Sequence, residues 1–97
     1  MYQIGNEEKL VIVLIDGGVE TTHPALRGAK ILSYSVTRTN SSYGIVEGSV
    51  DENGHGTAIA SLLYKKIPDA LFISFCIYND TLEAEVDKLI YTLKYIY

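Results

Sequence analysis

The chain has 97 residues, with 12 acidic against 8 basic side chains and a net charge of −4. This length suits one domain and excludes two, and a hydrophobic content of 47% argues for a folded core and against disorder. The acidic balance argues against non-specific binding to nucleic acid or to anionic membranes. The single cysteine, Cys76, excludes an internal disulfide framework and a zinc site built from several thiolates.

The longest purely apolar run, Leu10 to Ile15, is far too short to span a bilayer. No basic segment followed by an apolar stretch opens the chain, so no secretory signal is visible. We therefore expect a soluble, cytoplasmic protein, although a fragment of a secreted protein would show the same features.

The elements are predicted from hydrophobic periodicity and from the positions of glycine and proline. In chain order they are a strand at Leu10–Ile15 buried on both faces, a second strand at Ala29–Val36, a long loop from Thr37 to Gly54, a helix from His55 to Ile67 that ends before Pro68, a buried strand at Leu71–Tyr78 and a helix over Leu82–Tyr97.

Alternating strands and helices predict an α/β fold with a parallel sheet and right-handed crossovers. About three strands and two helices are few for such a sheet, because two fully apolar strands need cover on both faces. The last helix is apolar around most of its circumference, with Leu82, Val86, Leu89, Leu93 and Ile96 as its main stripe. Such a helix normally lies inside something larger, so we expect self-association or a partner at Leu71–Tyr78 and Leu82–Tyr97.

Two residues are candidates for chemistry. Asp16 ends the first predicted strand, where parallel sheets place their ligands, and Gly17 and Gly18 let the chain turn there. His55 opens a helix at the positive end of its dipole, which favours the neutral imidazole that a general base needs. Gly56 would let another segment approach the helix closely. Taken singly, Asp16 can equally belong to a simple turn, and His55 can be an exposed residue at a helix start.

The two segments together resemble the subtilisin-like serine proteases. The strand Val-Ile-Val-Leu-Ile-Asp16-Gly-Gly-Val19 and the motif His55-Gly-Thr-Ala-Ile-Ala-Ser61 are similar to that family's Asp and His motifs. Thr22-His23-Pro24-Ala25-Leu26, Asp51-Glu-Asn-Gly54 and Pro68-Asp-Ala-Leu71 are similar to further family patterns, in the same order. The resemblance runs from about Leu10 to the end of the sequence and implies a three-layer, parallel-sheet fold of subtilisin type.

The resemblance implies that Asp16 is the orienting acid and His55 the general base of an Asp-His-Ser triad for peptide-bond hydrolysis. The serine motif of the family, Gly-Thr-Ser-Met-Ala-x-Pro, is not present, and neither are the segments that form the oxyanion hole and the substrate cleft. Residues 1–97 therefore correspond to a single partial domain that needs a serine-bearing partner or C-terminal half. Gly17 replaces the usual Ser or Thr, and the family's calcium-binding loop after the histidine helix is lacking, so no cofactor or metal is expected.

Two alternatives remain open. The chain could be a catalytically inactive remnant that binds peptides or proteins with the old scaffold. It could also be a small independent enzyme that uses Asp16 and His55 with a metal or water. A metal site that adds Glu20 and His23 to these two residues matches no known ligand spacing.

Overall fold

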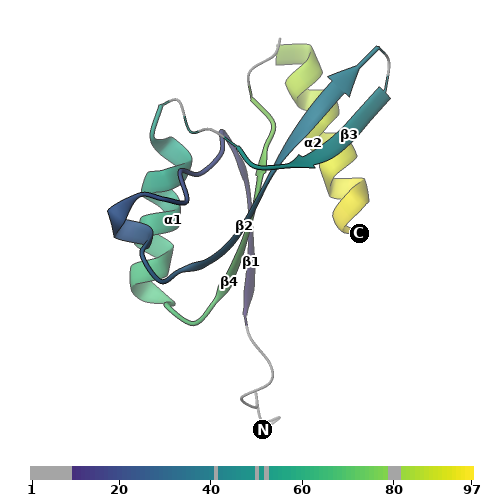
Figure 1. Cartoon of the computed structure of the whole chain (residues 1–97). Coiled ribbons are helices and arrows are strands. Elements are labelled where there is room, and N and C mark those ends of the chain that lie inside the picture. Colours follow the sequence, from purple (N-terminus) through teal and green to yellow (C-terminus); the bar gives the residue numbers. More distant parts are fainter. Residues whose placement is uncertain (1–9, 41, 50, 52, 79–81) are drawn as a thin grey trace, which may run out of the picture.

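A computed structural model describes residues 10–40, 42–49, 51, 53–78 and 82–97. Its elements are β1 (Val11–Asp16), the short 3-10 helix η1 (Pro24–Leu26), β2 (Lys30–Thr39), β3 (Ser42–Glu47), α1 (His55–Lys66), β4 (Leu71–Cys76) and α2 (Leu82–Ile96). The described chain forms one four-stranded sheet with two α-helices, which confirms the expected α/β class (Figure 1).

The sheet has the strand order β1-β4-β2-β3. β4 pairs in parallel with β1 on one side and β2 on the other, whereas β2 and β3 form an antiparallel hairpin. The prediction of a long loop from Thr37 to Gly54 is therefore wrong, as are the count of three strands and the wholly parallel sheet. Asn40, at φ 57°, adopts a left-handed conformation at the hairpin turn. β3 then places Tyr43 and Ile45 against the apolar cluster under α2.

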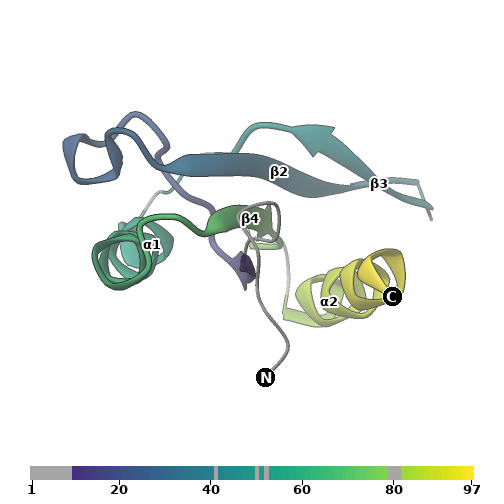
Figure 2. The ribbon, with the colours of Figure 1, turned by 90° about the horizontal axis from the view of Figure 1, so that it is seen from below.

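The two α-helices cover opposite faces of the sheet (Figures 1 and 2). On the α1 face, Val19, Leu26 and Ala60 form a buried cluster. On the α2 face the buried cluster is Val36, Phe75 and Ile77. Successive residues of a strand point to opposite faces, so β1 contributes Leu14 to the first cluster and Ile15 to the second.

The two apolar strands differ in their position in the sheet. β4 is central and largely buried, as predicted for Leu71–Tyr78, and Phe72 is fully buried. Because β1 and β2 flank this strand on both sides, Leu71–Tyr78 does not offer an open sheet edge to the expected partner. β1 lies at one edge of the sheet instead. Val11 and Val13 are 49% and 37% exposed, so the prediction that the first strand is buried on both faces is also wrong.

The helices do not bury the faces that their apolar periodicity predicts. α1 packs through Gly56, Thr57 and Ala60, and leaves Leu62 65% exposed. α2 buries Lys88 and Thr92, while most of its apolar stripe faces outward. Among the described side chains of α2, the exposed large hydrophobic ones are Val86, Leu89, Ile90, Leu93 and Tyr95. Small residues let α1 approach the loop after β1 closely. The large side chains on both helices are left exposed, as at a surface that another segment or chain covers.

Candidate catalytic site

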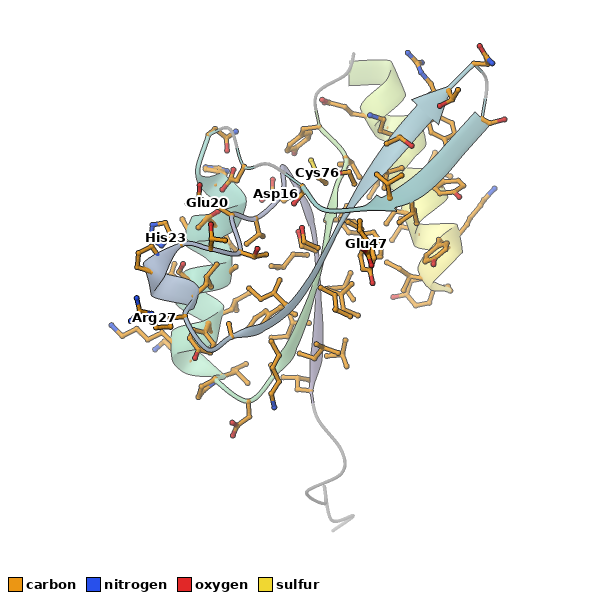
Figure 3. The ribbon with its side chains drawn as sticks, viewed as in Figure 1. Asp16, Glu20, His23, Arg27, Glu47 and Cys76 are labelled. Atoms are coloured by element: carbon orange, nitrogen blue, oxygen red, sulfur yellow. The ribbon has the colours of Figure 1, made fainter. Side chains whose placement is uncertain are left out.

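Asp16 lies at the carboxyl end of β1, as the sequence predicts. Its register partner in β4 is Cys76, and the two side chains lie at the same end of the sheet (Figure 3). The Asp16 carboxylate is half-buried, and its Oδ1 accepts a hydrogen bond of 2.8 Å from the Gly17 N–H. Within the described residues no donor bonds to the other carboxylate oxygen, Oδ2, so it can accept from a neighbouring group.

The N-terminus of α1 is held by side chains that precede it. Asp51 Oδ1 accepts from the Gly54 N–H and Asp51 Oδ2 from the Thr57 N–H, each at 2.9 Å. Asn53 Oδ1 accepts from the His55 N–H at 2.9 Å. Gly54 is the N-cap residue of α1 and has a φ of 81°, which glycine adopts without strain. Three of the otherwise unsatisfied N–H groups at the helix start are thus satisfied within a short loop.

Desolvation works to raise the pKa of the Asp51 carboxyl, but hydrogen bonds from Thr57, Gly54 and Asn53 outweigh it and hold that pKa below the ordinary value of 3.8. Asp51 therefore caps the N-terminus of α1, a role that the sequence analysis did not assign to it. Its position three residues before a glycine and six before the buried Thr57 is the signal that could have indicated this role.

A close backbone contact joins the Asp16 segment to the His55 segment. A Cβ placed on Gly56 would overlap the carbonyl oxygen of Gly18 and lie 3.0 Å from its carbonyl carbon, so only glycine fits there. One residue further on, Thr57 Oγ1 accepts a hydrogen bond of 2.8 Å from the Glu20 N–H. The expectation that Gly56 admits a close approach is confirmed, and the segment that approaches is the loop directly after Asp16.

Asp16 and His55 therefore flank one contact, but the structure does not join them into a hydrogen-bonded pair. The His55 side chain is exposed, and no hydrogen bond or ion pair connects it to Asp16 within the described residues. Catalytic hydrogen bonds are often loose in a free enzyme and tighten only around substrate. In the described part of the chain, no serine hydroxyl bonds to the His55 ring either. Ser61, on the same helix, donates instead to the Thr57 carbonyl at 2.7 Å.

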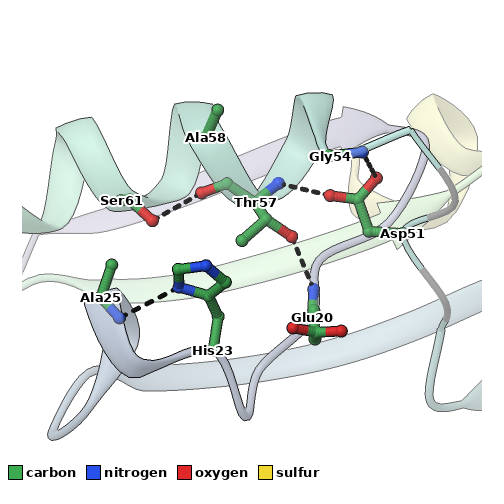
Figure 4. A pocket seen from close by; sticks show the side chains of 8 residues that line it. All are labelled: Glu20, His23, Ala25, Asp51, Gly54, Thr57, Ala58 and Ser61. Carbon is green, nitrogen blue, oxygen red and sulfur yellow. Dashed lines mark hydrogen bonds between the residues drawn. The ribbon is translucent and has the colours of Figure 1, made fainter.

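A hollow of about 420 Å³ lies beside the first turns of α1 (Figure 4). Its lining residues are Glu20, His23, Ala25, Asp51, Gly54, Thr57, Ala58 and Ser61. Neither Asp16 nor His55 lines it, so this hollow is not the site predicted for those two residues. His23 there caps the short helix η1, because its Nδ1 accepts a hydrogen bond of 3.0 Å from the Ala25 N–H. This contact explains His23 without a catalytic role.

Cys76 is buried, as expected for a small thiol in an apolar strand. Burial raises the pKa of the Cys76 thiol, which leaves it in the weakly reactive protonated form. In the described part of the chain, no three His, Cys, Asp or Glu side chains gather closely enough to hold a metal ion. The described helices also include none with the length and apolar character needed to cross a membrane.

Comparison with known proteins gives no relative. No protein family, no curated protein and no solved structure matches this chain.

Proposed function

We propose that the chain is the acid- and base-bearing half of a subtilisin-like serine endopeptidase. The observation that carries this proposal is the Gly18–Gly56 contact, because it brings the loop after Asp16 against the first turn of the helix that begins at His55. Both glycines belong to the motifs that resemble the family. The contact requires glycine at position 56, and Gly18 has a φ of 97°, which favours glycine there.

In the proposed mechanism, Asp16 holds the His55 ring in one tautomer and stabilises the imidazolium that forms during turnover. Asp16 Oδ1 is occupied by the Gly17 N–H, so Oδ2 would accept the ring N–H. The exposed His55 ring would take the proton from a serine that attacks the peptide carbonyl. That serine belongs to a segment outside this sequence, on the same polypeptide or on another.

The exposed apolar surfaces support the same proposal. Among the described residues, no strand pairs with the free side of β1, and the outward stripe of α2 has no cover. A further segment that adds a strand at β1 and packs on α2 would complete a subtilisin-type sheet. We therefore assign the chain to the subtilisin type of α/β fold as one part of a domain, and expect the missing segment or self-association at these surfaces.

The test is reconstitution. The chain alone should neither cleave casein nor react with a fluorophosphonate probe, because acid and base without a nucleophile leave almost no catalysis. Mixed with a chain from the same genome that carries Gly-Thr-Ser-Met-Ala and an upstream asparagine, it should form a complex that is labelled on that serine. Asp16→Asn and His55→Ala should abolish the labelling, whereas the control His23→Ala should keep it. Stoichiometric labelling of a serine in the isolated chain would refute the proposal.

One observation favours a second candidate function. The missing hydrogen bond between Asp16 and His55 fits a catalytically inactive remnant that binds peptides or proteins. In that case the reconstituted complex would form with full stoichiometry but show no labelling, and Asp16→Asn would leave its affinity unchanged.

A further inference from the structure

A second hollow, of about 320 Å³, lies at the carboxyl end of β4, away from the hollow beside α1. It forms where β4 stops at Cys76 while β2 continues beyond Ser35, the residue paired with Cys76. The described residues that line it are Ser35, Val36, Thr37, Arg38, Cys76, Tyr78 and Lys88. β2, β4 with its following residues, and α2 thus all contribute to its walls.

The lining carries a buried positive charge. Lys88 reaches the hollow from α2 and is only 5% exposed, although lysine is among the residues least often buried. The charge of Lys88 also affects the pKa of the neighbouring Cys76 thiol. Burial raises the pKa of Cys76, and among the charged groups acting on it Lys88, which lowers that pKa, has a larger effect than Asp51 or Asp16, which raise it.

Arg38 adds a second cation, and no acidic side chain is among the described lining residues. In a chain with a net charge of −4, this makes the hollow a local exception. A lysine ammonium offers three N–H donors and a guanidinium five, so both can bond within the chain and still serve a ligand. The hydroxyls differ: Ser35 donates to the Gly48 carbonyl at 2.6 Å and Thr37 to the Gly44 carbonyl at 3.4 Å.

We propose that this hollow binds a small ligand through a carboxylate or phosphate group whose oxygens accept hydrogen bonds from Lys88 and Arg38. Its volume is at the lower end of the range of about 300–1,000 Å³ for ligand pockets, which suits one small anionic group. Val36 and the Tyr78 ring supply apolar walls for the rest of such a ligand. The inference is independent of the protease proposal, because neither Asp16 nor His55 lines the hollow.

The experiment is a titration of the ¹⁵N-labelled chain, followed by NMR, with inorganic phosphate, with acetate and with chloride at matched ionic strength. Phosphate or acetate should give saturable shifts at residues 35–38, 76 and 88, and chloride should not. The stronger of the two ligands assigns the group as phosphate or carboxylate. Absence of saturation with both ligands, or the same response to chloride, would overturn the proposal.

The variants locate the site. Lys88→Met keeps the apolar stem and should weaken binding at least about tenfold, since a hydrogen bond from a charged donor is lost. Lys94→Met, on the exposed part of the same helix, is the control and should bind like the parent chain. If circular dichroism shows that Lys88→Met does not fold, Arg38→Gln decides, because Arg38 is exposed and its loss should still weaken binding several-fold. Unchanged affinity in the folded variant refutes the site.

Discussion

The substitution Gly56→Ala tests the contact on which the candidate site rests. In an ordinary helix this change would stabilise the protein by about 1 kcal/mol, because alanine is the better helix former. Here the new Cβ would overlap the Gly18 carbonyl oxygen, and that atom is backbone and cannot rotate away. The helix or the loop has to shift.

The magnitude follows from three contributions. Overpacking of this kind costs about 1–3 kcal/mol, and a shift of the loop also weakens the Thr57–Glu20 hydrogen bond, worth about 1 kcal/mol. Against these stands the gain in helix propensity. We expect a net loss of about 2 kcal/mol in the free energy of unfolding, which lowers Tm by roughly 8–16 °C in a domain of this size.

Thermal unfolding followed by circular dichroism measures this loss, and hydrogen exchange at the Glu20 amide reports the loop directly. Gly44→Ala is the matched control. A Cβ there would lie 3.8 Å from Thr37 Oγ1, an ordinary contact, so this variant should melt at or slightly above the parent temperature. A Gly56→Ala variant that melts as high as the parent chain would refute the close contact and, with it, the main support for the paired site.

The remaining predictions concern the cap, the loop and the metal. Asp51→Asn should lower the free energy of unfolding at neutral pH, because the depressed pKa of Asp51 means that the charged form stabilises the fold. That contribution is full above the ordinary pKa of 3.8 and is lost as pH falls through the lower folded value, so urea midpoints of variant and parent should converge in acid; a constant difference would contradict it. Thr57→Val should cost about 1–2 kcal/mol by leaving the Glu20 N–H without its acceptor, and Thr57→Ser should restore most of it; equal urea midpoints for the two variants would count against the bond. Calorimetry should detect no calcium binding at the short connection between α1 and β4, because the family's calcium-binding loop is lacking there. A measurable calcium affinity at this place would contradict the prediction.

Local signals predicted α1 and β4 well because those signals are strong. Pro68 cannot continue a helix, and α1 ends at Lys66, while the continuous apolar run of β4 fits its central position. The sequence analysis missed β3 because it is short and its apolar residues do not alternate regularly: Tyr43 and Ile45 are separated by a glycine, and Val46 follows directly. It is a strand because β2 offers a partner, which no local pattern reveals.

The order of the strands in the sheet could not be predicted from the sequence either. The apolar runs of β1 and β4 look alike, yet one lies at the edge and the other in the centre. Periodicity identified the apolar stripe of α2 but not which side of the helix is buried, because Lys88 and Thr92 are the buried residues instead. At the site, the motifs predicted that the segments of Asp16 and His55 meet. They did not predict that the two side chains remain without a hydrogen bond, which depends on rotamers and not on residue types.

The strand order also sets how this chain can fold as it is made. β1 and β2 have no direct pairing, and both bond to β4, which emerges from the ribosome after α1. Until Leu71–Cys76 is synthesised, the nascent chain can form the local β2–β3 hairpin and α1, but it has no parallel sheet to assemble. Folding of the sheet must therefore wait for β4, and during that wait the apolar run of β1 is exposed to chaperones or to a strand of another molecule.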